Sequence, residues 1–396
     1  MNSKLLGSIL LIIGTSIGAA MLGLPIAAAE LGFVGSLILL LVCWFIMIAG
    51  AFLILEVNLW LPQNSNLISM AKSTIGPLGQ IIAWITYLLL FYSLLCAYIA
   101  GGSDLFHNLL QAAGLKIPAW TTAVLFTLIF SSIVFLGIRS VDWANRVLML
   151  TKFSVFFVLI FMLIFSISPD KLLQGNLHHL TSISAIMVTA TSFGWATLIP
   201  SLRVYFAGDL KKLKLAMIIG SIIPLICYII WDAVIMGIIP LTGENSLVFI
   251  LHSANSTSDL VNILSSSVNK NSVIFSVKLF TSICVLTSFL GVSLCLTDFF
   301  ADGFHLEKKG KNRLILHAIT FIPALGIAII FPHAFIKALA YAGMYCVILL
   351  ILLPAWMAWC GRYHQNKQSQ FKVPGGKIFL SMLMVFSLIL IVKFCV

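Results

Sequence analysis

Residues 14–25 read GTSIGAAMLGLP and lie in the middle of the first apolar segment of the chain. Glycine loosens a helix, and proline removes one backbone donor from it. Inside a bilayer, backbone groups released in this way persist only where they line a cavity or are buried in protein. The stretch therefore predicts either a broken membrane helix or, through the pair Gly14 and Gly18, a surface for close helix packing.

A second copy of this pattern lies near the middle of the chain. Residues 191–196 read TSFGWA and are followed by Pro200, whereas residues 15–20 read TSIGAA and are followed by Pro25. Interrupted apolar segments at corresponding positions of two halves are typical of a transporter binding site. The repeat therefore favours the broken helix over simple packing.

The composition indicates a polytopic membrane protein, since 61% of the 396 residues are hydrophobic and 9% are charged. About 20 apolar residues span a bilayer. The first segment has 25 uncharged residues, which is long for a signal peptide, so we expect it to be retained. We predict eleven spans from the stretches without Asp, Glu, Lys or Arg, which are residues 5–29, 31–55, 73–103, 117–138, 153–169, 180–202, 215–231, 279–297, 314–336, 338–361 and 378–392.

The basic residues predict the orientation of these spans. Most of the 23 Lys and Arg residues flank the span ends on the same side as Lys4, and an excess of these residues marks the cytoplasmic side. We therefore expect a cytoplasmic N-terminus and, after eleven spans, a periplasmic C-terminus. The net charge of +11 then reflects topology, and no nucleic-acid partner is expected.

The spacing of the two copies predicts an inverted repeat. Five spans separate them, and an odd number reverses the direction of the chain. We expect a single transporter domain, residues 1–396, with one repeat at residues 5–167, the second at 180–361 and an additional helix at 375–396. The outer loop 241–271 is expected to contain a helix over the outer end of the bundle, and a disordered loop is the alternative.

The two breaks suit a zwitterionic ligand. The N-terminus of a half-helix presents N–H groups to a carboxylate, and unwound carbonyls suit an ammonium group. We expect the first break to bind the carboxylate, the second to bind the ammonium, and the aromatic rings to line the side-chain pocket. The two span-3 tyrosines either join this pocket or pack against lipid and other helices. The predicted substrate site comprises Thr15, Ser16, Ile17, Gly18, Ala19, Ala20, Tyr92, Tyr98, Thr191, Ser192, Phe193, Gly194 and Trp195.

Other chemistry has little support in the sequence. It contains no GxxxxGK[ST] loop for ATP and no cluster typical of a metal site or a nucleophile. We therefore predict no enzyme activity and no cofactor. Acidic residues near span ends, such as Glu56 and Asp104, are interpreted as capping or network residues.

Four stretches together resemble the bacterial hydroxy/aromatic amino acid permeases. The resemblance implies an all-helical fold of eleven spans, with a LeuT-like 5+5 inverted repeat of the APC superfamily and broken helices 1 and 6. It also implies uptake of an aromatic L-amino acid by proton symport, with tyrosine as the expected substrate. We further expect a monomer in the bacterial inner membrane. The stretches are GTSIGAAMLGLPIAAAE (14–30), TSFGWATLIPS (191–201), GDLKKLKLAMIIGSIIPLICYIIW (208–231) and TSFLGVSLCLTDFFAD (287–302).

The chain departs from this family pattern at both breaks. Relatives read G-x-G where this chain has Gly18-Ala19-Ala20, and they have Phe-His where it has Trp195-Ala196. The second change alters the volume and the hydrogen bonding of the expected pocket. A tryptophan or phenylalanine permease therefore remains an alternative.

Lys152 lies in the fifth span, where a charge is costly. One interpretation is that its side chain extends to the cytoplasmic surface. The other, which the resemblance supports, places its ammonium beside Thr287 and Ser288, where relatives bind sodium, and gives it a role in proton coupling. A sodium-coupled transporter, and a channel or sensor without coupled turnover, remain further alternatives.

Overall fold

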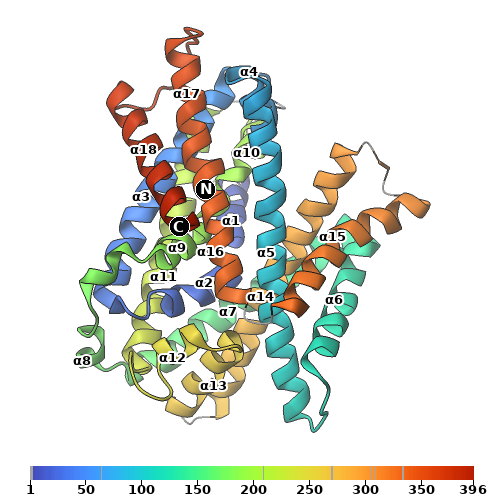
Figure 1. Ribbon diagram of the computed structural model, residues 1–396, viewed down its shortest axis with the longest axis vertical. Helices are drawn as coiled ribbons and strands as arrows, with labels where there is room; N and C mark the ends of the chain where they lie inside the picture. Colours follow the sequence, from blue (N-terminus) through green and yellow to red (C-terminus); the bar gives the residue numbers. More distant parts are fainter. Residues whose placement is uncertain are drawn as a thin grey trace.

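The computed structural model describes residues 3–63, 65–207, 209–268, 271–304, 306, 307, 309–331 and 334–396. In these parts of the chain all regular secondary structure is helical (Figure 1). Ten of the described helices are long and apolar enough to cross a membrane, and a bent pair near the N-terminus makes eleven if it counts as one span. The chain is therefore a multi-pass membrane protein.

The first apolar segment is broken where the sequence predicts it. α1 (Ser3–Ser16) and α2 (Ala19–Ala27) are bent by 50° relative to each other. Gly18, between them, has φ −151° and ψ −153°, which is extended backbone. The last carbonyls of α1 and the first amides of α2 are therefore outside the helical hydrogen-bond pattern.

The sixth segment is interrupted more gently. α9 (Ile183–Ser192) is followed by one 3₁₀ segment (Gly194–Leu198) and then by α10 (Ile199–Tyr205). Pro200 occupies the first turn of α10, where its missing N–H costs nothing. This segment is continuous enough to count as one membrane span, yet its hydrogen-bond pattern changes directly after Ser192.

The remaining spans are mostly long single helices. The tenth span is the exception, because one π-helical segment (Ile348–Leu352) joins α16 (Ala334–Val347) to α17 (Leu353–Tyr363). The other spans are α3 (Gly32–Leu59), α5 (Pro77–Ala112), α6 (Ala119–Leu136), α7 (Ile138–Leu163), α11 (Leu210–Ile238), α14 (Asn271–Gly303), α15 (Gly310–Ile330) and α18 (Gly376–Cys395).

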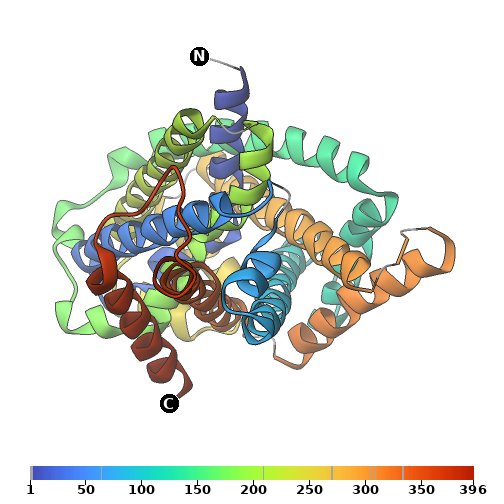
Figure 2. The same ribbon diagram turned by 90° about the horizontal axis from the view of Figure 1, so that it is seen from above.

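The two interrupted segments lie at the centre of the bundle. α2 is buried along its whole length and packs against α9 and α11, while α1 packs against α11. Helices α6 and α15 lie on the side of the bundle away from α18 (Figures 1 and 2). These outer helices expose apolar side chains, such as Leu128, Ile322 and Ile378, which fits contact with lipid.

Short helices cover one end of the bundle. The loop expected to contain a helix forms α12 (Leu247–His252) and α13 (Ser256–Val268), at the end opposite α4 (Leu67–Thr74) (Figure 1). The carboxylate of Asp104 on α5 accepts hydrogen bonds from the hydroxyl of Thr257 (2.5 Å) and from the amide of Ser258 (2.8 Å). Asp104 therefore caps α13 and attaches it to α5.

A buried ion pair lies near the opposite end of the bundle. The guanidinium of Arg362 on α17 donates two hydrogen bonds, of 2.7 and 2.5 Å, to the carboxylate of Glu56 on α3. The amide of Val373 donates a third hydrogen bond to that carboxylate, at 2.7 Å. Both charged side chains are almost fully buried, so each satisfies the other in a region of low dielectric.

Backbones approach closely where α16 crosses α9. A Cβ placed on Gly343 would lie 1.9 Å from the carbonyl oxygen of Met187. Thr191 on α9 strengthens this crossing, because its hydroxyl donates to the carbonyl of Leu339 on α16 at 2.8 Å. Small residues allow this kind of close contact between membrane helices.

We expect the substitution Gly343→Ala to destabilise the protein. The added methyl group meets backbone and not a flexible side chain, so α9 and α16 must separate, at a cost of about 1–3 kcal/mol. The midpoint of thermal unfolding in detergent should fall. Gly326→Ala on α15, where a Cβ meets no heavy atom within 4 Å, is the control. Equal midpoints for the two variants would contradict this packing.

Candidate substrate site

The carbonyl end of α1 receives two side-chain donors from other spans. The hydroxyl of Tyr228 on α11 donates to the carbonyl oxygen of Ser16 at 2.6 Å. The ammonium of Lys152 on α7 donates to the carbonyl oxygen of Ile17 at 2.5 Å. A positive charge is favoured at this end of a helix because the carbonyl dipoles point towards it.

Lys152 is fully buried between three spans. In addition to its hydrogen bond with Ile17, its ammonium lies 3.3 Å from the hydroxyl of Thr287 on α14. In the described part of the chain no carboxylate forms an ion pair with it. The side chain points into the bundle, which does not fit the interpretation that it extends to the surface.

The amino end of α2 presents backbone amides to the centre of the bundle. The amide of Ala19 donates to the hydroxyl oxygen of Ser288 on α14 at 2.9 Å. Among the described residues no protein group accepts the amides of Gly18 and Ala20. Free amides at the start of a helix are suited to an anion such as a carboxylate.

The second break is held by its own hydroxyl groups and by Tyr228. The hydroxyl of Thr191 lies within hydrogen-bond distance of two carbonyls, those of Met187 (3.0 Å) and Leu339 (2.8 Å), and shares its one proton between them. The carbonyl oxygen of Ser192, the last residue of α9, accepts the hydroxyl of Tyr228 at 2.8 Å. One tyrosine therefore contacts the carbonyl ends of both broken segments.

Aromatic side chains surround the two breaks. Phe193 and Trp195 are both buried, and the ring of Phe193 packs edge-on against Tyr228, with a centroid distance of 5.3 Å. Tyr98 on α5 is buried with its hydroxyl facing Ser288. Gly194 leaves room beside Cys346, whose sulfur would lie 3.4 Å from an added Cβ.

Two residues of the predicted site lie elsewhere. The hydroxyl of Tyr92 donates to the carbonyl of Ile319 on α15 at 2.7 Å, and its ring packs on Phe300, so this side chain is directed away from the breaks. Thr15 is exposed, and its hydroxyl donates a hydrogen bond within α1, to the carbonyl oxygen of Ile12 at 2.9 Å.

Tyr228 was not among the predicted residues. It is one aromatic residue in the long apolar run of α11, and nothing in its sequence neighbourhood distinguishes it. The only signal available was its place in the stretch 208–231 that resembles the permeases.

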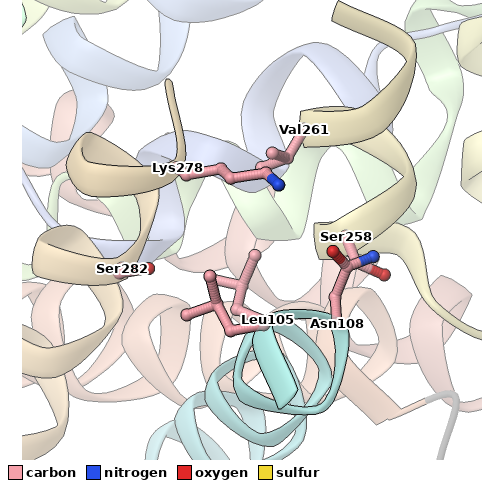
Figure 3. A pocket seen from close by; sticks show the side chains of 7 residues that line it. Leu105, Asn108, Ser258, Val261, Lys278 and Ser282 are labelled. Carbon is pink, nitrogen blue, oxygen red and sulfur yellow. The ribbon is translucent and has the colours of Figure 1, made fainter. Parts of the chain in front are cut away.

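Two adjoining cavities lie away from the breaks, between α5 and α14. One has a volume of about 120 Å³ and is walled by apolar residues that include Phe106, Phe126 and Phe130. The other, of about 10 Å³, has room for roughly one water molecule. Figure 3 shows Lys278 and Asn108 facing this smaller space. Neither cavity contacts the residues predicted to bind the substrate.

Buried helix ends of opposite polarity at the centre of an apolar bundle are the features by which membrane transporters hold a small solute. The sequence pattern of the tryptophan/tyrosine permease family matches residues 1–394. The chain therefore belongs to the tryptophan/tyrosine permease family, and it is a transporter of amino acids and not an enzyme. This confirms the family resemblance found in the sequence.

Individual relatives are similar over almost their whole length. The chain is 34% and 32% identical to the tyrosine-specific transport systems 1 and 2 of Haemophilus influenzae, over 98% of this chain and 96% of each relative. It is 33% identical to glutamine transporter 2 of Aliivibrio fischeri, over 99% of this chain and 100% of that relative.

We expect Gly18→Ala to lower the uptake of the transported amino acid at least about tenfold. The added Cβ would lie 2.2 Å from the hydroxyl oxygen of Ser288, so it displaces this side chain and obstructs the free amides of α2. The measurement is initial uptake of labelled amino acid by cells that contain equal amounts of protein. Gly291→Ala, one turn along α14 from Ser288 with open space around it, is the control. Unchanged uptake by the Gly18 variant would exclude these amides as ligands.

Proposed function

We propose that this permease imports an aromatic amino acid, with tyrosine preferred, across the bacterial cytoplasmic membrane by proton symport. The observation that supports this proposal most strongly is the buried ammonium of Lys152 on the carbonyl end of a broken helix. The site then works by alternating access within a LeuT-like inverted repeat, residues 5–167 and 180–361, with helix 375–396 added. The N-terminus is cytoplasmic and the C-terminus periplasmic in this proposal.

The substrate is held mainly by the protein backbone. Its carboxylate binds the free amides of Gly18 and Ala20 at the start of α2, where the helix dipole favours negative charge. Its ammonium binds carbonyls at the second break, around Ser192. Because both ligand charges are met by fixed dipoles, the site needs no charged side chain in contact with the amino acid.

The ring of the substrate occupies the aromatic surroundings of the breaks. Phe193, Trp195 and Tyr98 are buried there, and aromatic pairs are favoured by about 0.5–1.5 kcal/mol beyond their burial. This lining supports an aromatic substrate in preference to glutamine, although one relative is named a glutamine transporter. Tryptophan and phenylalanine are the alternatives within the same site.

Protonation of Lys152 couples the proton to this site. The charged ammonium holds the end of α1 through Ile17 and contacts α14 through Thr287. Loss of the proton removes the charge that the carbonyl end of α1 attracts, so the contact weakens and α1 is released. Ser288 on the same turn of α14 transmits the movement to α2, because it accepts the amide of Ala19.

The test is uptake of labelled tyrosine into proteoliposomes under a pH gradient and, separately, under a sodium gradient. Unlabelled tryptophan, phenylalanine and glutamine serve as competitors. We expect accumulation with the pH gradient alone, inhibited more by the aromatic amino acids than by glutamine. Accumulation only with sodium would contradict proton coupling. Tyrosine binding without accumulation under either gradient would indicate a sensor.

We expect Lys152→Met to abolish accumulation driven by the pH gradient while exchange of tyrosine across the membrane continues. Methionine fills a similar volume but carries no proton, so the solute can still cross without being concentrated. The measurement compares net accumulation with exchange in the same proteoliposomes. Lys116→Met, on the exposed loop before α6, is the control. Full accumulation by the Lys152 variant would exclude this residue from coupling.

A further inference from the structure

Tyr228 has no role in the proposed function. Its side chain is completely buried, and its hydroxyl lies 2.6 Å from the carbonyl oxygen of Ser16 and 2.8 Å from that of Ser192. Both serines are the last residues of their half-helices, α1 and α9. These carbonyls have no partner inside their own helix, so they must be satisfied from elsewhere.

The two carbonyls belong to equivalent residues of the sequence repeat. Ser16 is the second residue of TSIG, and Ser192 is the second residue of TSFG. The hydroxyl of Tyr228 therefore contacts the same backbone atom in both copies of the motif. This contact joins the two breaks at one point, and it comes from a third span.

The hydroxyl of Tyr228 and the carbonyls of Ser16 and Ser192 form a cluster of three oxygens that cannot satisfy one another completely. A tyrosine hydroxyl has one proton to donate, so it can fully satisfy only one of the two carbonyls at a time. Among the described residues no hydrogen bond is donated to its oxygen, which can accept one. Three oxygens therefore converge, from Ser16, Ser192 and Tyr228, with one proton among them.

A primary ammonium group matches this arrangement. It has three donors and no acceptor, and its hydrogen bonds to oxygen are about 2.7–2.9 Å long. A nitrogen at that distance from all three oxygens would donate to each of them or share the carbonyls with the hydroxyl. The free amides of Gly18 and Ala20 belong to residues two and four positions after Ser16 in the chain, so the proposed carboxylate subsite lies close to this cluster.

The ring of Tyr228 is held in place independently of the hydroxyl. Phe193 packs edge-on against it, and both side chains are buried. A preorganised acceptor loses little entropy when a ligand binds, which is the requirement for a binding residue.

We propose that Tyr228 is a substrate-binding residue: its hydroxyl oxygen accepts a hydrogen bond from the ammonium group of the amino acid while its proton satisfies the carbonyl of Ser16 or Ser192. Tyr228 thereby positions both broken helices around the amino group. This inference rests on the proposed amino acid transport and adds the residue that recognises the amino group.

The experiment compares two ligands that differ only in the amino group. Tyrosine and 3-(4-hydroxyphenyl)propionate compete against labelled tyrosine for purified wild-type protein and for the Tyr228→Phe variant. The substituted phenylalanine side chain keeps the packing with Phe193, and only the hydroxyl is removed. We expect the preference for tyrosine over the deamino compound to fall roughly tenfold to a hundredfold in the variant. Tyr341→Phe on α16, an exposed tyrosine, should keep the wild-type preference.

The ratio of the two affinities does not depend on how much of the protein is folded, and thermal unfolding in detergent reports folding separately. Tyr228→His keeps a polar ring and should give an intermediate ratio, so the test does not depend on a single variant. An unchanged ratio in both variants would overturn the inference while leaving the proposed transport intact. A preference that becomes sensitive to sodium in Tyr228→Phe would also overturn it, because the carbonyls would then bind a metal cation. If wild-type protein binds neither compound and transports no aromatic amino acid, the proposed function itself fails.

Discussion

A backbone group released from a helix inside a membrane needs another partner, because leaving it unpaired costs several kcal/mol. The interruptions after Ser16 and Ser192 release such groups at the centre of the bundle. Their partners come from three other spans, as Tyr228 on α11, Lys152 on α7 and Ser288 on α14. The packing of these spans around α1, α2 and α9 depends on that requirement as well as on apolar contact.

The same requirement explains why a broken helix serves transport. A carbonyl that is held by a side chain can exchange that partner for a solute group of the same character, with little change in the backbone. The break at Ile17 and Gly18 also separates charge preferences along one axis, since the carbonyl end of α1 favours cations and the amino end of α2 favours anions. An amino acid zwitterion has this separation of charge. In the proposed mechanism, the buried ammonium of Lys152 acts on the solute through the backbone of α1 and not through direct contact.

The sequence predicted the positions at which apolar helices are interrupted. It did not predict the residues whose roles depend on the direction in which their side chains point in the folded protein. Glycine, threonine, serine and proline revealed both breaks, and the cost of a charge in a membrane singled out Lys152. Tyr228 carried no such signal, because tyrosine is tolerated in any apolar helix. Tyr92 and Tyr98 differ by six residues, which places them roughly 120° apart around α5. Only Tyr98 faces the breaks, and hydrophobicity alone could not tell which face points to the centre.

The most direct test of this account is an experimentally determined structure of the protein with bound tyrosine. We expect the carboxylate of the ligand to lie against the amides of Gly18 and Ala20, with its ring beside Phe193 and Trp195. A ligand found instead in the apolar cavity between α5, α6 and α14, with the two breaks unchanged, would contradict it.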